Sequence, residues 1–134
     1  MKKILKLLLG LSILGSSTLF AMKNEIIDKK HSQDLQLKNG YKAIIGSLKP
    51  LTKGKNNLAI IILKNNKFIE NADVNIIFAL PTLQNMEFSE HALEKNNYYN
   101  VNLNFKEKGE WEYELMFKTK YGAIYSKEGR ITVN

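Results

Sequence analysis

The chain has 134 residues, with 20 basic and 13 acidic side chains and no cysteine. The lack of cysteine excludes disulfides, thiol chemistry and zinc sites built on thiolates, so an exported domain with this sequence must be held together by its apolar core. Nineteen of the basic residues are lysines scattered among 15 asparagines, whereas a nucleic-acid reader is expected to cluster basic and aromatic residues on one face. We therefore expect a solvated lysine-rich surface and no nucleic-acid partner.

Residues 1–21 have the pattern of a secretory signal peptide. Three lysines precede an apolar run at 7–14, and a patch of small residues ends at Ala21. The apolar run is too short, and too rich in Gly and Ser, for a comfortable membrane span. We expect cleavage after Ala21 and a periplasmic or secreted protein. An uncleaved anchor is the alternative, because Leu19 is less usual than Ala at its position, and only then would the protein be bound to the membrane.

The mature chain, residues 22–134, has 113 residues and a formal net charge of +4, which fits one small domain. Residues 22–34 are mostly polar and lack a sustained hydrophobic period, which predicts a flexible or loosely docked arm. From residue 35 to 134, short runs with period two alternate with turns rich in Gly, Asn and Lys. The predicted strands cover 35–38, 41–48, 57–63, 72–80, 98–105, 110–119 and 122–133.

The clearest strand is 110–119, where apolar and charged residues alternate. Its apolar face carries Trp111, Tyr113, Leu115 and Phe117, and its wet face carries Glu112, Glu114 and Lys118. The runs 74–80 and 99–105 each show one apolar face of the same kind, and such faces need a second sheet to bury against. Turns are expected at 63–68, where Asn tolerates positive φ, and around Gly109. The pattern predicts an all-β fold, an immunoglobulin-like antiparallel β-sandwich of about seven strands.

A polar segment, 81–97, interrupts the strands and carries Met86 and His91. It is either a solvated cover over one end of the sandwich or the remnant of a soft-metal site. Five residues of separation put Met86 and His91 about 140° apart on a helix and on opposite faces of a strand, so only an irregular loop brings both to one ion. In the alternative, Met86 and Phe88 plug the end of the sandwich and His91 is solvated.

The sequence contains no recognisable catalytic constellation. Glu87 and Glu90 form one carboxylate pair, but the set at 110, 112 and 114 alternates on a wet strand face, where ordinary cross-strand pairing is expected. General acid–base catalysis needs a carboxylate with a raised pKa in a cleft. No serine elbow, phosphate loop or H-E-x-x-H pattern occurs. We predict a protein that is not an enzyme, with no small-molecule substrate evident.

Several short motifs occur in a familiar order. They are Lys53-Gly54-Lys55-Asn56 before an apolar strand, N-A-D-V-N-I-I-F at 71–78 ahead of Pro81, a loop containing Met86, an aromatic strand from Tyr98, and G-x-W at 109–111. In this order the chain resembles the FixH/YtkA-like exported domains over about residues 41–133. The resemblance implies an immunoglobulin-like sandwich. It also implies a role in copper handling, as in a copper-resistance determinant of this family, or in assembly of copper-containing oxidases.

The family's M-P-x-M type loop departs from its pattern here. Leu80 and Leu83 stand at two of its positions, and only Met86 keeps a sulfur atom. Because a single thioether is a weak donor for Cu(I), a copper site would need Met86 and His91 together, with His31, Glu87 or Glu90 as a further ligand. Met116, between Leu115 and Phe117, is expected to serve packing.

Two functional hypotheses follow. In the first, the protein is an exported accessory domain that binds copper or passes it on. In the second, it has lost the metal and pairs with an envelope protein through an exposed sheet edge or through Tyr98 and Tyr99. Close approach of Met86 and an imidazole favours the first hypothesis, and wide separation with Met86 buried favours the second.

Overall fold

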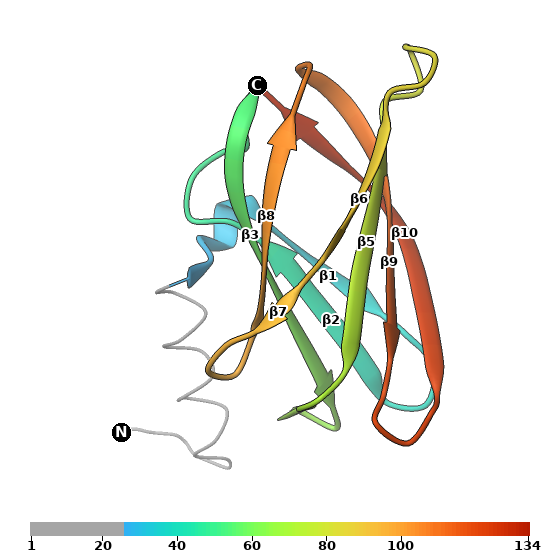
Figure 1. Ribbon diagram of the computed structural model, residues 1–134. Coiled ribbons are helices and arrows are strands. Elements are labelled where there is room, and N and C mark those ends of the chain that lie inside the picture. Colours follow the sequence, from blue (N-terminus) through green and yellow to red (C-terminus); the bar gives the residue numbers. More distant parts are fainter. Residues whose placement is uncertain (1–25) are drawn as a thin grey trace.

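The computed structural model describes residues 26–134 (Figure 1). The predicted signal peptide and residues 22–25 lie outside this range. The described chain is all-β apart from a short 3₁₀ turn, η1 (Lys29–His31). Its strands are β1 (Ser32–Gln36), β2 (Tyr41–Gly46), β3 (Gly54–Lys64), β4 (Lys67–Phe68), β5 (Asp73–Ala79), β6 (Glu87–His91), β7 (Leu93–Glu94), β8 (Tyr99–Phe105), β9 (Gly109–Lys118) and β10 (Ile124–Val133).

The strands form two antiparallel sheets that pack face to face (Figure 1). One sheet has the order β1-β2-β3-β8-β7, with β4 beside β3, and the other has the order β10-β9-β5-β6. With β2 taken as strand A, these orders reproduce the A-B-E-D and G-F-C-C′ sheets of an immunoglobulin sandwich, and β1 is an addition at the edge. The predicted fold class is confirmed. Each of the seven predicted strands is present within a few residues, while β4, β6 and β7 were not predicted.

The alternating strands bury the faces that the sequence indicates. Three sets of alternate residues point into the core and are almost fully buried. They are residues 74, 76, 78 and 80, the odd residues 99–105 and the odd residues 111–117. At one end, Phe78, Phe88, Phe105 and Trp111 form an aromatic cluster with ring centroids 5.2 to 5.7 Å apart. The indole Nε1 of Trp111 donates to the carbonyl of Glu107 at 3.0 Å, so its one polar atom is satisfied in the core.

Two turns form as their residues predict. Asn65 and Asn66, with φ of 50° and 68°, make the two-residue connection between β3 and β4, a conformation that Asn adopts more easily than other side chains. Gly109 has φ of 140° where β9 begins, which only glycine adopts without strain. The hairpin predicted at 63–68 is therefore confirmed. The hairpin predicted around Gly109 is wrong, because β8 and β9 lie in different sheets and the turn between them crosses from one sheet to the other.

The prediction of a flexible arm over 22–34 is wrong for the part that the structure describes. Ile27 is fully buried against the outer face of the first sheet, together with Ile44 and Ile61. Gly46 permits this close approach, because a Cβ at this position would lie 2.6 Å from the carbonyl oxygen of His31. Ser32 to Asp34 then pair with β2. The burial of Ile27 and the backbone hydrogen bonds between β1 and β2 therefore hold this segment against the first sheet, although its polar composition predicted a flexible or loosely docked arm.

The polar segment 81–97 is not a single loop. Within it, β6 pairs with β5 of the second sheet, and β7 pairs with β8 of the first sheet. Ala92 lies between them, is 3 % exposed, and donates its N–H to the carbonyl of Val74 at 2.9 Å. Residues 87–94 therefore form one edge segment that crosses from sheet to sheet and closes this side of the sandwich.

Candidate functional site

Met86 ends a short turn that follows β5. The N–H of Leu80 donates to the carbonyl of Met86 at 2.9 Å, and the N–H of Leu83 donates to the carbonyl of Leu80 at 3.0 Å. Asn85 supplies the positive φ, 60°, that turns the chain back. Met86 is half-buried and packs against the main core, while Leu83 is 45 % exposed. The thioether therefore faces the core at this end of the sandwich.

His91 lies at the other end of β6, on the outer face of the second sheet. Its Nδ1 is 3.1 Å from Asn75 Oδ1 and 3.3 Å from Asp73 Oδ1, and its side chain is 54 % exposed. A carboxylate oxygen only accepts hydrogen bonds, so Nδ1 is the nitrogen that carries the proton. In the neutral ring, Nε2 is then left with a lone pair. Histidines that bind a metal ion through one ring nitrogen usually donate the other ring N–H to a carboxylate or carbonyl oxygen in this way.

The structure does not bring the predicted metal ligands together. Five residues of extended chain separate Met86 from His91, which corresponds to about 16 Å, and the two side chains serve opposite sides of the sheet. His31 lines a separate depression of about 330 Å³ with Ser47 and Ile131. Within residues 26–134, no three His, Cys, Asp or Glu side chains are grouped so that they could hold a metal ion. The positions match the alternative in which Met86 and Phe88 pack and His91 is solvated.

Glu87 and Glu90 point to different surfaces. Glu87 borders a depression of about 410 Å³ over the outer face of the second sheet, which it shares with Glu112, Glu114, Glu128 and Arg130. Glu90 instead lines a groove over the first sheet. The strand alternation of β6 accounts for this division.

Met116 is a further soft donor, which the sequence led us to expect in a packing role. In β9 the core residues are odd-numbered, so Met116 is on the outer face, and it is half-buried there. It pairs with Asn75 in the neighbouring strand, and Asn75 pairs in turn with His91. Met116, Asn75 and His91 therefore form one row across three strands, with about 10 Å between the outer two Cα atoms. The alternation at 110–119 would have placed Met116 on this face.

The carboxylates of the outer face are not arranged for acid–base catalysis. Glu114 and Glu128 pair directly across β9 and β10, and Arg130 lies 3.4 Å from Glu112. These groups are partly or fully exposed, and they form a cross-strand charge pattern on a wet surface rather than a pair inside a cleft.

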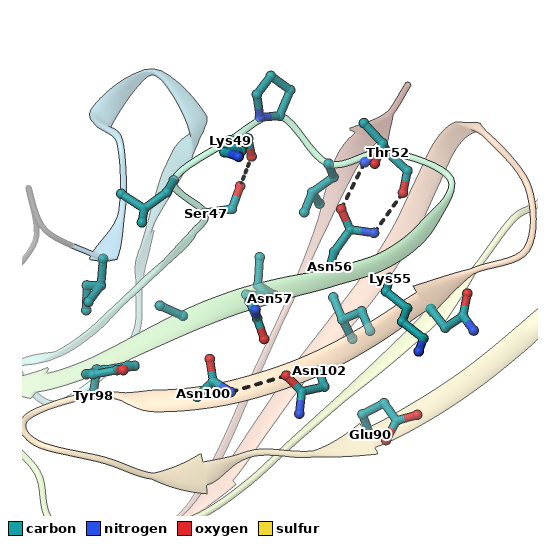
Figure 2. A pocket seen from close by; sticks show the side chains of 18 of the residues that line it. Ser47, Lys49, Thr52, Lys55, Asn56, Asn57, Glu90, Tyr98, Asn100 and Asn102 are labelled. Carbon is teal, nitrogen blue, oxygen red and sulfur yellow. Dashed lines mark hydrogen bonds between the residues drawn. The ribbon is translucent and has the colours of Figure 1, made fainter.

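A groove of about 1180 Å³ lies over the outer face of β3 and β8 (Figure 2). Its floor carries Asn57, Asn100, Asn102 and Asn104. One wall is the loop between β2 and β3, with Leu48, Lys49 and Pro50, and Glu90, Lys95 and Tyr98 line the opposite side. No local sequence pattern indicates this groove, because its lining comes from strands and loops that are distant along the chain.

Asn56 fixes the loop that forms the wall of this groove. Its Oδ1 accepts from the N–H of Thr52 at 3.0 Å, and its Nδ2 donates to the carbonyl of Thr52 at 2.7 Å (Figure 2). Nδ2 also donates to the carbonyl of Gly54 at 2.8 Å. Gly54 has φ of 103°, which favours glycine. The Lys53-Gly54-Lys55-Asn56 motif is therefore a loop-shaping motif.

The two tyrosines proposed as a docking pair have different roles. Tyr99 is fully buried, and its hydroxyl donates to the carbonyl of Ile69 at 2.7 Å and accepts from the N–H of Ala72 at 3.0 Å. Burial raises the pKa of Tyr99, as a structural phenol in the core requires. Tyr98 is half-buried at the rim of the groove. Only Tyr98 is accessible to a ligand.

The fold defines an immunoglobulin-like antiparallel β-sandwich domain. The model of the YtkA-like protein family matches residues 35–116, from β1 to within β9. The chain belongs to the YtkA-like family, which is not a known enzyme family and whose membership indicates an exported accessory protein. Comparison with curated proteins and with solved structures found no match. In the described part of the chain, no helix has the length and hydropathy of a membrane span.

Proposed function

We propose that the protein is an exported, non-enzymatic accessory domain that acts in the periplasm or cell envelope by binding another protein. The observation that carries this proposal is the separation of the two soft donors. Met86 packs against the core, whereas His91 is exposed on the outer face of the second sheet, about 16 Å away along the strand. Membership in the YtkA-like family supports export and an accessory role.

Site-specific photo-crosslinking in cells tests this function. The full chain is expressed with a photoreactive phenylalanine derivative at one outer-face position at a time, including Tyr98 on the first sheet and Glu114 on the second. We expect a discrete crosslinked protein from positions on one face and none from the other. If no exposed position on either face yields a crosslink while the protein is exported normally, the proposed function is wrong.

Copper handling is the second candidate, and the orientation of His91 favours it. Asp73 and Asn75 hold Nδ1, so Nε2 is left as the donor, and Met116 lies in the same row of the sheet. An imidazole with a thioether is a soft donor set that suits Cu(I), whereas a solitary Met86 facing the core does not. In this candidate function, His91 and Met116 would hold the ion.

A Cu(I) titration of the full chain against a competing chelator tests the copper candidate. Stoichiometric binding that weakens in His91→Ala and Met116→Leu, but not in the matched control Met86→Leu, would establish this site. Equal weakening in Met86→Leu would restore the predicted pair of Met86 and His91. No binding above that of the chelator would retire copper as a ligand.

A further inference from the structure

The floor of the groove over β3 and β8 carries amides at a regular spacing. Asn100, Asn102 and Asn104 alternate along β8 with buried residues, so their side chains share the outer face. Asn57 pairs with Asn102 from the neighbouring strand. Alternate residues of a strand are about 6.7 Å apart. The floor is therefore a row of carboxamides with a two-residue repeat.

An extended peptide has the same repeat. Along one edge it presents an N–H and a C=O from every second residue, about 6.7 Å apart. An asparagine side chain offers one acceptor and two donors in a plane, which is what a peptide unit needs to form a paired hydrogen bond. The backbone groups of β3 and β8 pair with each other here, so the side-chain amides are the polar groups that face the groove. Asn100 Nδ2 donates to Asn102 Oδ1 at 3.4 Å, which leaves the second N–H of Asn100 and the amino group of Asn102 for a ligand (Figure 2).

The walls of the groove indicate which side chains such a peptide carries. A peptide that turns one backbone edge to the floor directs alternate side chains toward opposite walls. The wall formed by the loop between β2 and β3 includes Leu48, which is 52 % exposed, and Pro50. Lysines 49, 55 and 95 also line the groove, against the single carboxylate of Glu90. This lining complements a peptide that alternates apolar and acidic residues.

We propose that this groove is a docking site for an extended, acidic segment of a partner protein, which lies along β8 and pairs its backbone with the floor asparagines. The inference rests on the proposed function and specifies the surface and the chemistry of the partner. Tyr98 closes one end of the groove, where its ring supplies an amphipathic contact.

Fluorescence anisotropy with synthetic decapeptides tests the recognition. Three peptides serve as probes: an alternating Val/Asp peptide, the same peptide N-methylated at alternate amides, and an alternating Val/Lys peptide. A chitin oligosaccharide is added as a competitor. We expect the Val/Asp peptide to bind, N-methylation on the floor-facing edge to weaken binding at least tenfold, and the Val/Lys peptide not to bind. Peptide binding that N-methylation leaves unchanged, or displacement of the peptide by the oligosaccharide, would overturn the proposal.

Variants of the full chain locate the binding. Asn57→Thr and Asn102→Thr keep strand-compatible side chains and should each weaken binding about fivefold, while Glu114→Gln on the other sheet should not change it. Because an asparagine variant could also disturb the fold, Lys55→Glu with Lys95→Glu gives a second test, in which preference should shift from the Val/Asp to the Val/Lys peptide. Unchanged preference in this double variant contradicts the proposal.

The crosslinking experiment separates failure of this inference from failure of the proposed function. A crosslinked protein from Tyr98 that disappears in the Lys55→Glu, Lys95→Glu background supports the groove. A crosslinked protein from Glu114 and none from Tyr98 would overturn the groove and leave the proposed function standing. No crosslink from either sheet face overturns both.

Discussion

Tyr113 in β9 donates its phenolic O–H to Oε1 of Gln33 in β1, and thereby joins the two sheets at their open edge. Gln33 in turn donates from Nε2 to the carbonyl of Arg130 in the edge strand β10, at 2.6 Å. A Cβ at Gly129 would collide with the Tyr113 hydroxyl, so the absence of a side chain at Gly129 leaves room for the Tyr113 ring. This chain of contacts ties the edge strand of each sheet to the other sheet.

Tyr113 should make stability fall in alkaline solution. Burial raises the pKa of Tyr113 from 10.0 to about 12. The unfolded chain loses the phenolic proton first, so the stabilisation is complete below pH 10 and is lost as the pH rises to about 12. We expect Tyr113 to account for a loss of about 1–2 kcal/mol over this range, measured by urea unfolding. The Tyr113→Phe variant should lack this part of the pH dependence, and identical profiles for the two proteins would contradict the assignment.

Gly46→Ala should loosen the segment that covers the first sheet. The added methyl would lie 2.6 Å from the His31 carbonyl oxygen and 2.9 Å from Ser32 Cα, and neither backbone atom moves without displacing the segment. We expect a loss of about 1–3 kcal/mol in the free energy of unfolding. Hydrogen exchange should accelerate at the N–H of Asp28 and Ser47, which bond across this contact. Exchange that accelerates equally throughout both sheets would show that the segment has no separate role.

Met86→Ala should cost stability. The side chain is half-buried against the core, so truncation should lower the free energy of unfolding by about 1–2 kcal/mol. His91→Ala, at an exposed position, should change it by less than about 0.5 kcal/mol. Thermal unfolding without added metal measures both, and the reverse ranking would mean that the packing role of Met86 is wrong.

Asn66→Gly should stabilise the hairpin between β3 and β4. Asn66 has φ of 68°, in a region that costs glycine less than any other residue. We expect a gain of a few tenths of a kcal/mol, and Asn66→Ala should lose about 1 kcal/mol. Denaturant midpoints for the pair measure the difference, and a stabilising alanine would refute the turn assignment.

Glu128→Lys should stabilise the second sheet in dilute buffer. Glu128 lies directly opposite Glu114, and like charges in paired positions repel. Reversing one charge should raise the free energy of unfolding by about 0.2–1 kcal/mol, and most of this gain should vanish in 1 M salt. The control is Lys127→Glu, one residue away on the same strand and on its other face. This variant should not raise the free energy of unfolding.

The alternation of apolar residues predicted most of the fold because it records which face of a strand is buried. In 110–119 every second residue enters the core, and the structure keeps this pattern without exception. Strand β6 escaped prediction because Glu87, Ser89 and His91 are exposed at a sheet edge, where the backbone ladder holds the strand without an apolar face.

Less of the candidate site could be predicted. The groove depends on Leu48, Asn57 and Tyr98, which approach only after β2, β3 and β8 have paired in the first sheet, and no local pattern relates them. The docking of the N-terminal segment did leave a signal in the continuous apolar run 58–63. A strand with one wet face alternates, so this run indicated that β3 is buried on both sides.

The edge segment 87–94 connects the two sheets in a way that does not depend on redox conditions. Immunoglobulin domains of antibodies are joined across their sheets by a disulfide, whereas this chain has no cysteine and instead carries one stretch of backbone from the second sheet to the first. Its ladder bonds form from peptide groups alone, so neither an oxidising nor a reducing compartment alters them. The two sheets should therefore unfold together and refold without an oxidative step, whatever the thiol–disulfide poise around them.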